Sequence, residues 1–214
     1  NSSSLFTVSG GAYFTGNTGA IGTDVPALSP YAVEGTHCFG LTNGTATLTT
    51  TSSIDTSPYT GITASFRLGS FSIGSTGNGA DGTDVVTVQV SPDGGTTYYS
   101  TVRVLGNTNA TWSYAAGTGV ATTPYDGNAT PVDFIPTGGG ARTTDGYSTV
   151  IVTGLPAVTT LKIRITLLNN ATAERWVIDD FKVQGTLSCT APTTQASSFS
   201  SSSVSNFSGT VNWV

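Results

Sequence analysis

The chain has 214 residues, of which only 9% are charged, and its formal net charge is -5 at pH 7. Ordinary soluble domains carry about 25% charged residues. Solubility here therefore depends on hydroxyl and amide side chains, as in many extracellular β-proteins. The few basic residues are scattered along an acidic chain, which excludes a basic nucleic-acid footprint. No apolar run reaches the roughly 20 residues that a membrane-spanning helix needs.

Strand patterns dominate the chain, and no window shows the apolar spacing of an amphipathic helix. The clearest alternation lies in residues 84–90 and 160–167, which should be central core strands. Their inward sets are Val86, Val88 and Val90, and Leu161, Ile163, Ile165 and Leu167. The other predicted strands are residues 45–50, 62–68, 97–105, 147–152 and 175–183, a number that suits two packed antiparallel sheets.

The turn at residues 91–95 contains Pro92 and the pair Gly94 and Gly95. Proline presets φ and glycine supplies positive φ, so this turn is expected to join residues 84–90 and 97–105 as neighbouring strands.

Residues 106–145 form a long segment rich in Gly, Asn, Thr and Pro. A loop of that length is often functional. The alternative is an ordinary crossover with one or two short strands, held to the sandwich by its aromatic side chains.

After residue 189 the composition changes to a Ser- and Thr-rich run. We therefore predict one β-sandwich domain over residues 1–189, followed by a linker and an isolated strand over residues 190–214. In the last segment Val211 and Trp213 alternate as they would in a strand. Because the chain contains no Met, we expect it to begin after a removed signal peptide.

Cys38 and Cys189 are too far apart in sequence for a CxxC metal or redox motif. In an oxidising compartment they predict one long-range disulfide. The alternative is two buried free thiols.

Two acidic residues lie on the apolar faces of predicted strands. Asp179 is in phase with Val177 and Phe181, and Asp84 shares a face with Val86. A carboxylate there must be paired, bonded to backbone N–H groups, or bound to a metal. Together with Glu34 these acids predict a calcium site, since Ca²⁺ takes carboxylate and carbonyl oxygens. The alternative is that each acid caps a turn or bonds to loop backbone.

Aromatic side chains supply the candidate ligand-binding residues, because a flat ring stacks on the apolar face of a sugar. The candidates are Trp112, Tyr114 and Tyr125, with Tyr98 and Tyr99 as a further pair. The alternative for each is core packing or covering of a strand edge.

An enzyme is not predicted. The single histidine, His37, lies in a strand pattern and is expected to be structural. No strand carries the paired carboxylates of a glycosidase.

The chain resembles the jelly-roll modules of secreted multi-domain bacterial proteins, including MAM-type and carbohydrate-binding modules. The resemblance rests on residues 31–35 (YAVEG), 81–95 (DGTDVVTVQVSPDGG) and 176–181 (WVIDDF). It implies an antiparallel jelly-roll β-sandwich and a structural calcium held by Glu34 and Asp179. The segment from Cys189 resembles the start of a fibronectin type III domain, with Trp213 at the position of the core tryptophan.

These features predict a non-catalytic extracellular or cell-surface structural and adhesion module. It would bind copies of itself or other surface proteins, with the terminal strand, residues 207–214, added to the sheet edge of a neighbour in a filament. The alternative is a glycan-binding accessory module of a secreted enzyme.

Overall fold

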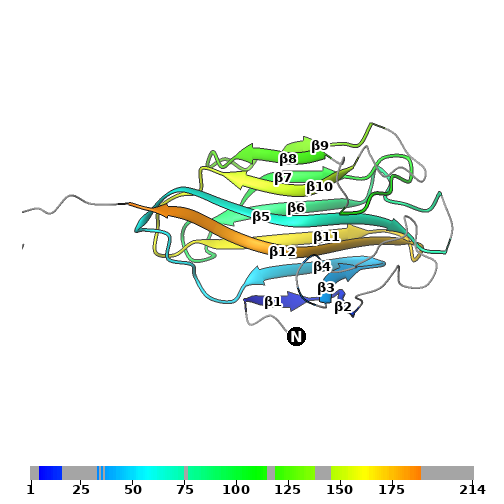
Figure 1. Cartoon of the computed structure of the whole chain (residues 1–214), viewed down its shortest axis with the longest axis horizontal. Helices are drawn as coiled ribbons and strands as arrows, with labels where there is room; N and C mark the ends of the chain where they lie inside the picture. The colour runs from blue at the N-terminus through cyan, green and yellow to red at the C-terminus, as the bar shows by residue number, and fades with distance from the viewer. Residues whose placement is uncertain are drawn as a thin grey trace, which may run out of the picture.

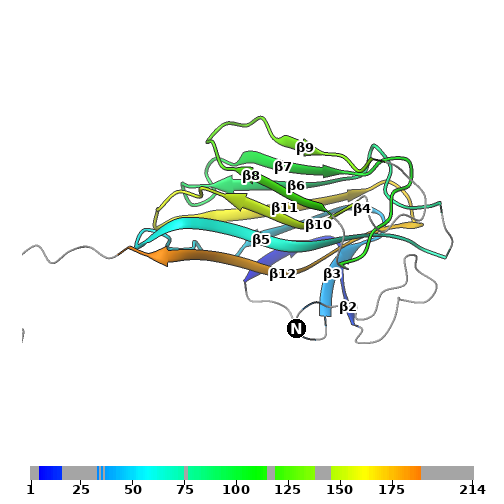
Figure 2. The same cartoon turned by 45° about the horizontal axis from the view of Figure 1, so that its top comes forward.

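The computed structural model describes residues 5–15, 33, 35, 37–74, 77–114, 119–137 and 146–188. All regular secondary structure in these residues is β-strand, arranged as two six-stranded sheets packed face to face (Figures 1 and 2). The prediction of an all-β sandwich is confirmed. Within the same residues there is no helix of the length and apolarity needed to cross a membrane.

The first sheet, sheet A, has the strand order β1 (Phe6–Ser9), β4 (Gly44–Thr50), β11 (Lys162–Asn169), β6 (Val85–Ser91), β7 (Tyr99–Leu105) and β9 (Val132–Phe134). The second, sheet B, has the order β2 (Ala12–Thr15), β3 (His37–Leu41), β12 (Glu174–Leu187), β5 (Tyr59–Ser72), β10 (Tyr147–Thr153) and β8 (Gly119–Pro124). From β3 to β12, consecutive strands change sheet at every connection except the β6–β7 hairpin.

The predicted antiparallel arrangement holds except at one side of the sandwich. The pairs β10–β8 and β7–β9 are parallel, whereas the other ladders are antiparallel. The cause is the connection: β8 and β10 are joined through β9 in the opposite sheet, and β7 and β9 through β8. A crossover of that kind returns the chain in the same direction. The edge strands β8 and β9 both come from the long segment 106–145, so the crossover interpretation of that segment is confirmed.

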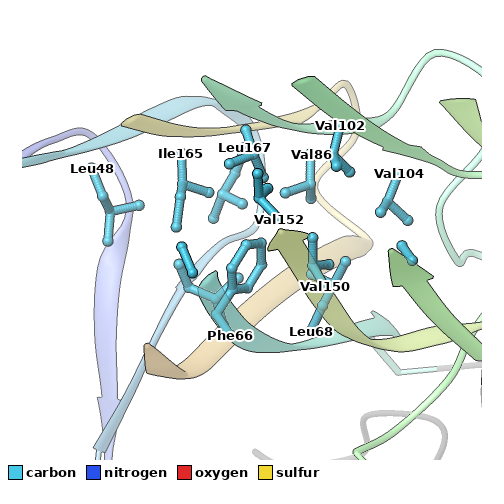
Figure 3. Packing of buried hydrophobic residues seen from close by; sticks show 14 of the residues in the cluster. Leu48, Phe66, Leu68, Val86, Val102, Val104, Val150, Val152, Ile165 and Leu167 are labelled. Carbon is cyan, nitrogen blue, oxygen red and sulfur yellow. The ribbon is translucent and has the colours of Figure 1, made fainter. Parts of the chain in front are cut away.

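The core lies between the two sheets. Leu48, Ile165, Leu167 and Val86 from sheet A face Phe66, Leu68, Val150 and Val152 from sheet B (Figure 3). The inward sets predicted for residues 84–90 and 160–167 are all buried, at 2% exposure or less. The alternation of apolar residues therefore identified the two central strands of sheet A correctly. The predicted pairing of β6 with β7 through the turn at residues 91–95 is also confirmed.

Strand β12 contains a bulge that the sequence pattern did not predict. Asp180 has φ of 53°, and the register with β5 shifts between Asp179 and Lys182. Trp176 and Ile178 precede the bulge and belong to the core, and Phe181 follows it and also packs against the core. Asp179 is therefore out of phase with Phe181, contrary to the prediction, because the extra residue reverses the alternation.

The predicted linker and terminal strand, residues 190–214, lie outside the described residues, as does Glu34. The domain boundary at residue 189 stays a prediction.

Candidate functional site

Three acidic side chains meet at one end of the sandwich. Asp81 and Asp84 lie in the loop that leads into β6, and Glu174 is the first residue of β12. Their ligand atoms lie within 4.8 Å of one another, and Asp84 is fully buried. This cluster of carboxylates could hold a metal ion. Only Asp84 was among the metal ligands predicted from the sequence.

Backbone N–H groups surround the acidic cluster. The two oxygens of Asp84 accept bonds from the N–H groups of Asp81, at 2.7 Å, and Asn170, at 2.9 Å. Asp81 accepts from the N–H of Thr83 at 2.8 Å, and Glu174 accepts from the N–H of Ala171 at 3.2 Å. The alternative considered for Asp84, bonding to loop backbone, is therefore confirmed. The bond from Asn170 to Asp84 joins the loop before β6 to the β11–β12 turn.

Burial makes Asp84 and Glu174 bind protons more tightly than isolated carboxyl groups do. It raises the pKa of Glu174 to about 7, with a further contribution from the charge of Asp84. Burial also raises the pKa of Asp84. A carboxylate pair of this kind is stabilised by a proton or by a cation placed between the oxygens.

The other two predicted metal ligands do not join this cluster. Asp179 lies along β12 on the outer side of sheet B, where its Oδ2 accepts the N–H of Val33 at 2.5 Å. Glu34 is outside the described residues. The predicted convergence of Asp84 with Asp179 is wrong, because Asp84 lies beside Glu174 at the start of β12. Asp179 is five residues further along that strand, roughly 16 Å away. The sequence signal for this cluster is the DGTD motif, residues 81–84, of which only Asp84 was predicted to be a ligand.

The predicted ligand-binding aromatics are core residues or lie close to the core. Trp112 is fully buried, stacks edge to face with Trp176 at 5.4 Å, and donates from Nε1 to the carbonyl oxygens of Leu68 and Tyr147. Tyr114 is 8% exposed, and the guanidinium of Arg67 lies 5.9 Å from its ring centre.

Tyr125 is half-buried and packs edge to face against Tyr99 at 6.2 Å. The alternative considered for these rings, core packing and edge covering, describes them correctly.

The predicted disulfide is not formed, and Cys38 is a buried free thiol. Burial, followed by the charge of Asp179, raises the pKa of Cys38 to about 12. Cys189 is outside the described residues. Its neighbour Ser188 lies beyond the end of β12, bonded to Pro58. On a strand spacing of about 3.3 Å per residue, Ser188 is on the order of 25 Å from the part of β12 beside Cys38. A disulfide needs Cα atoms within about 7 Å.

A pocket of about 400 Å³ lies where β5 begins and β12 ends. Figure 1 shows these two strand ends at the end of the sandwich opposite the start of β12. Its lining includes Ile54, Asp55, Tyr59, Ile62, Val183 and Gln184. The floor is apolar, since Ile62 is 3% exposed, and Tyr59 remains 38% exposed at the mouth. The volume falls in the range of small-molecule sites, about 300 to 1,000 Å³.

Two glycines shape the pocket. Gly61 has φ of 60°, and the β5–β12 register shifts between Gln184 and Thr186, across Gly185. A Cβ on Gly185 would lie 3.0 Å from the Cβ of Tyr59, so the tyrosine would have to shift slightly to admit a side chain there. The irregular pairing separates the ends of the two strands from the regular sheet and leaves room for the pocket.

The pocket wall is held by hydrogen bonds to the β10–β11 connection. The buried hydroxyl of Thr56 donates to the carbonyl oxygen of Pro156 at 2.8 Å, and its backbone N–H donates to that of Val158 at 2.8 Å. On the same side of the pocket, Ile54 forms an isolated antiparallel β-bridge with Leu161. Asp55 accepts hydrogen bonds from both the hydroxyl and the backbone N–H of Ser57. These two bonds lower the pKa of the Asp55 carboxyl and keep it ionised. No sequence pattern predicted this site, because its residues come from a loop and two strand ends.

No protein-family model matches the chain, and no curated protein matches it significantly. Among solved structures it is similar to one described as TmCBM61 in complex with β-1,4-galactotriose, at 14% identity and a TM-score of 0.40. The match covers 84% of this chain and 88% of that chain. A similarity of this degree assigns no ligand to the present protein.

Proposed function

We propose that the chain is a non-catalytic extracellular module that binds glycans in the pocket beside Tyr59. The observation that carries the proposal is the combination of an exposed ring, a carboxylate and an amide around an apolar floor. A sugar offers an apolar face for the ring and hydroxyl groups for the polar side chains.

Each part of the pocket has a defined role in this proposal. Tyr59 stacks on the ring of one sugar residue. Both bonds described for Asp55 end at its Oδ1, so Oδ2 is the acceptor for a sugar hydroxyl. Gln184 supplies both a donor and an acceptor through its amide. Because Thr56 fixes the wall in place, little conformational entropy is lost on binding.

The test is native affinity electrophoresis in gels that contain dextran, galactan, xylan or mannan. The wild-type chain is expected to be retarded by at least one of these polysaccharides. Tyr59→Ala should weaken that retardation roughly fivefold or more, since a stacking contact contributes about 1 kcal/mol. Leu187→Ala is the matched control, because Leu187 is 60% exposed and pairs with Tyr59 across the strands without lining the pocket.

The same test has two outcomes that would contradict the proposal. One is the absence of retardation by every polysaccharide tested. The other is a ligand that binds the wild type and Tyr59→Ala equally well, which would place the binding surface elsewhere.

A second candidate function is a structural subunit of a surface assembly. It is favoured by the edge formed by β8 and β9, where Val120, Val132 and Ile135 are each about half exposed. An uncovered edge strand is a template for pairing with another chain. Light scattering tests it: wild-type oligomers that dissociate when residues 190–214 are deleted would support the assembly function, and a monomer at all concentrations would exclude it.

For the acidic cluster we propose calcium as the stabilising ion. Asp81, Asp84 and Glu174 are hard oxygen donors, and the neighbours that raise the pKa of Glu174 are themselves carboxyls. Ca²⁺ tolerates irregular geometry and mixed carboxylate and carbonyl ligands, whereas Mg²⁺ demands an octahedron. The cluster would then hold the loop before β6 against β12, with no part in ligand binding at the far end.

A further inference from the structure

The outer face of sheet A carries two basic side chains on one strand. Lys162 and Arg164 alternate along β11 with the buried residues Ile163 and Ile165, so both project away from the core. Residues two apart on a strand lie about 7 Å apart on the same face. The two residues are half-buried and form a pair of cations on the outer face of sheet A.

Tyr98 contacts one member of this pair, Arg164. It precedes β7, and the guanidinium of Arg164 lies 3.6 Å from the centre of its ring. Gly95, in the β6–β7 turn, has φ of 98°. A Cβ on this glycine would lie 3.1 Å from the hydroxyl of Tyr98 and 3.4 Å from Cδ of Lys162. The glycine thus leaves room beside the turn for both Tyr98 and Lys162, with Arg164 stacked on the ring of Tyr98.

In the described part of the chain, neither cation of the pair is matched by a carboxylate. Lys162 donates from Nζ to the carbonyl oxygen of Thr51 at 3.3 Å, and Arg164 contacts the ring of Tyr98. In contrast, Arg103 binds Asp133 at 2.6 Å and Lys182 binds Asp180 at 2.7 Å. The chain has 12 acidic and seven basic residues, yet two of the positive charges lie together on one face of sheet A.

The surroundings of the pair are hydrogen-bonding groups. Arg164 is directly opposite Thr49 on β4 and Gln89 on β6. Gln89 donates from Nε2 to the hydroxyl of Ser100 at 3.1 Å, which extends the polar row to β7. A row of hydroxyl and amide groups with a stacked ring suits a sugar, and the two cations suit an anionic group on that sugar.

We propose that Lys162, Arg164 and Tyr98 form a binding site for an acidic glycan, one that carries sulfate or carboxylate groups. The site shares no residue with the pocket beside Tyr59 and does not depend on the function proposed for that pocket. The charge of the pair complements the ligand, and the polar row across β4, β11 and β6 supports a sugar chain lying on the sheet.

The experiment compares binding of lightly sulfated dextran, polygalacturonate and unmodified dextran by isothermal titration calorimetry at low ionic strength. The wild type should bind one or both anionic polymers at least tenfold more tightly than dextran. The double variant Lys162→Gln/Arg164→Gln should lose roughly tenfold in affinity for the anionic polymer, because it removes two charge-assisted contacts.

The matched control is Arg103→Gln/Lys182→Gln, which also removes two positive charges but at ion-paired positions. It should change affinity by less than about threefold, and thermal melts should show all variants folded. Equal losses in the two double variants would overturn the proposal, as would wild-type binding no tighter than to dextran. Tyr59→Ala should retain the binding, and a loss in that variant would assign the anionic polymer to the pocket instead.

Discussion

The carboxyl groups of Asp84 and Glu174 meet at one end of the sandwich, although one residue precedes β6 in sheet A and the other begins β12 in sheet B. Their proximity links the two sheets through groups that bind protons or a cation. This relationship makes stability sensitive to pH and to divalent ions.

Without a cation, stability should fall as the pH rises through the range in which Glu174 loses its proton. The pKa of Glu174 is about 7 in the folded protein against 4.5 for a free glutamate. The folded state therefore holds more protons than the unfolded state between these values, and its stability decreases as pH increases. Urea unfolding in EDTA at about pH 5 and about pH 8 measures the loss.

The variant Glu174→Gln should show a smaller loss over the same pH range, because glutamine does not titrate. Asp126→Asn, at an exposed turn residue, is the control and should behave as the wild type does. Parallel pH dependence in the wild type and Glu174→Gln would refute the assigned role of Glu174.

Calcium should oppose this effect. Adding Ca²⁺ is expected to raise the melting temperature of the wild type at about pH 8, since a ligand that binds only the folded state stabilises it. The variant Asp84→Asn/Glu174→Gln should show no such increase. Mg²⁺ at the same concentration should raise the melting temperature less, and equal increases with both ions, or an increase retained in the variant, would contradict calcium binding at this cluster.

Gly146 is expected to be intolerant of any side chain. A Cβ at this position would lie 2.0 Å from Cδ2 of Trp112, which is fully buried. Gly146→Ala should therefore reduce the free energy of unfolding by about 2 kcal/mol or more, as overpacking of a core does. Gly82→Ala, where a Cβ meets nothing within 4 Å, should change it by less than about 0.5 kcal/mol. Equal effects in urea unfolding would show that Trp112 can move aside.

The thiol of Cys38 should be unreactive in the folded protein. It is 2% exposed, and burial raises its pKa to about 12, so almost none of it is thiolate at neutral pH. Its reaction with Ellman's reagent should proceed only as fast as the protein unfolds. A melting temperature lowered by reductant would reveal a disulfide and contradict the free thiol.

The sequence predicted the parts of the fold in which side-chain alternation decides burial. Val86, Val88 and Val90 could occupy the core face of only one register, so β6 and its hairpin with β7 were predictable. The parallel edge strands were not, because β8 and β9 are short and depend on which sheet each crossover reaches. In β12 a single residue, Asp180, reverses the phase, and an aspartate at positive φ leaves no sign in the pattern.

The candidate sites, like the fold, could be predicted from the sequence only in part. The DGTD motif marked Asp84 as a polar residue at a strand start, but its partner Glu174 is distant in sequence and could be identified only from the packing. Trp112 was assigned to a binding surface because it lies in a long polar segment, whereas its large apolar area is better stabilised between the sheets. Tyr59 was overlooked because neither alternation nor a motif distinguishes it.

The central claim, glycan binding beside Tyr59, is tested most directly by ¹H–¹⁵N NMR titration of the intact chain with a polysaccharide that retards it in affinity electrophoresis. The account predicts saturable shifts of the backbone amides of Asp55, Tyr59, Gln184 and Gly185, and no comparable shifts at Asp84 or Asn170. Shifts confined to β8 and β9, or to the acidic cluster, with the amides of the pocket unchanged, would contradict it.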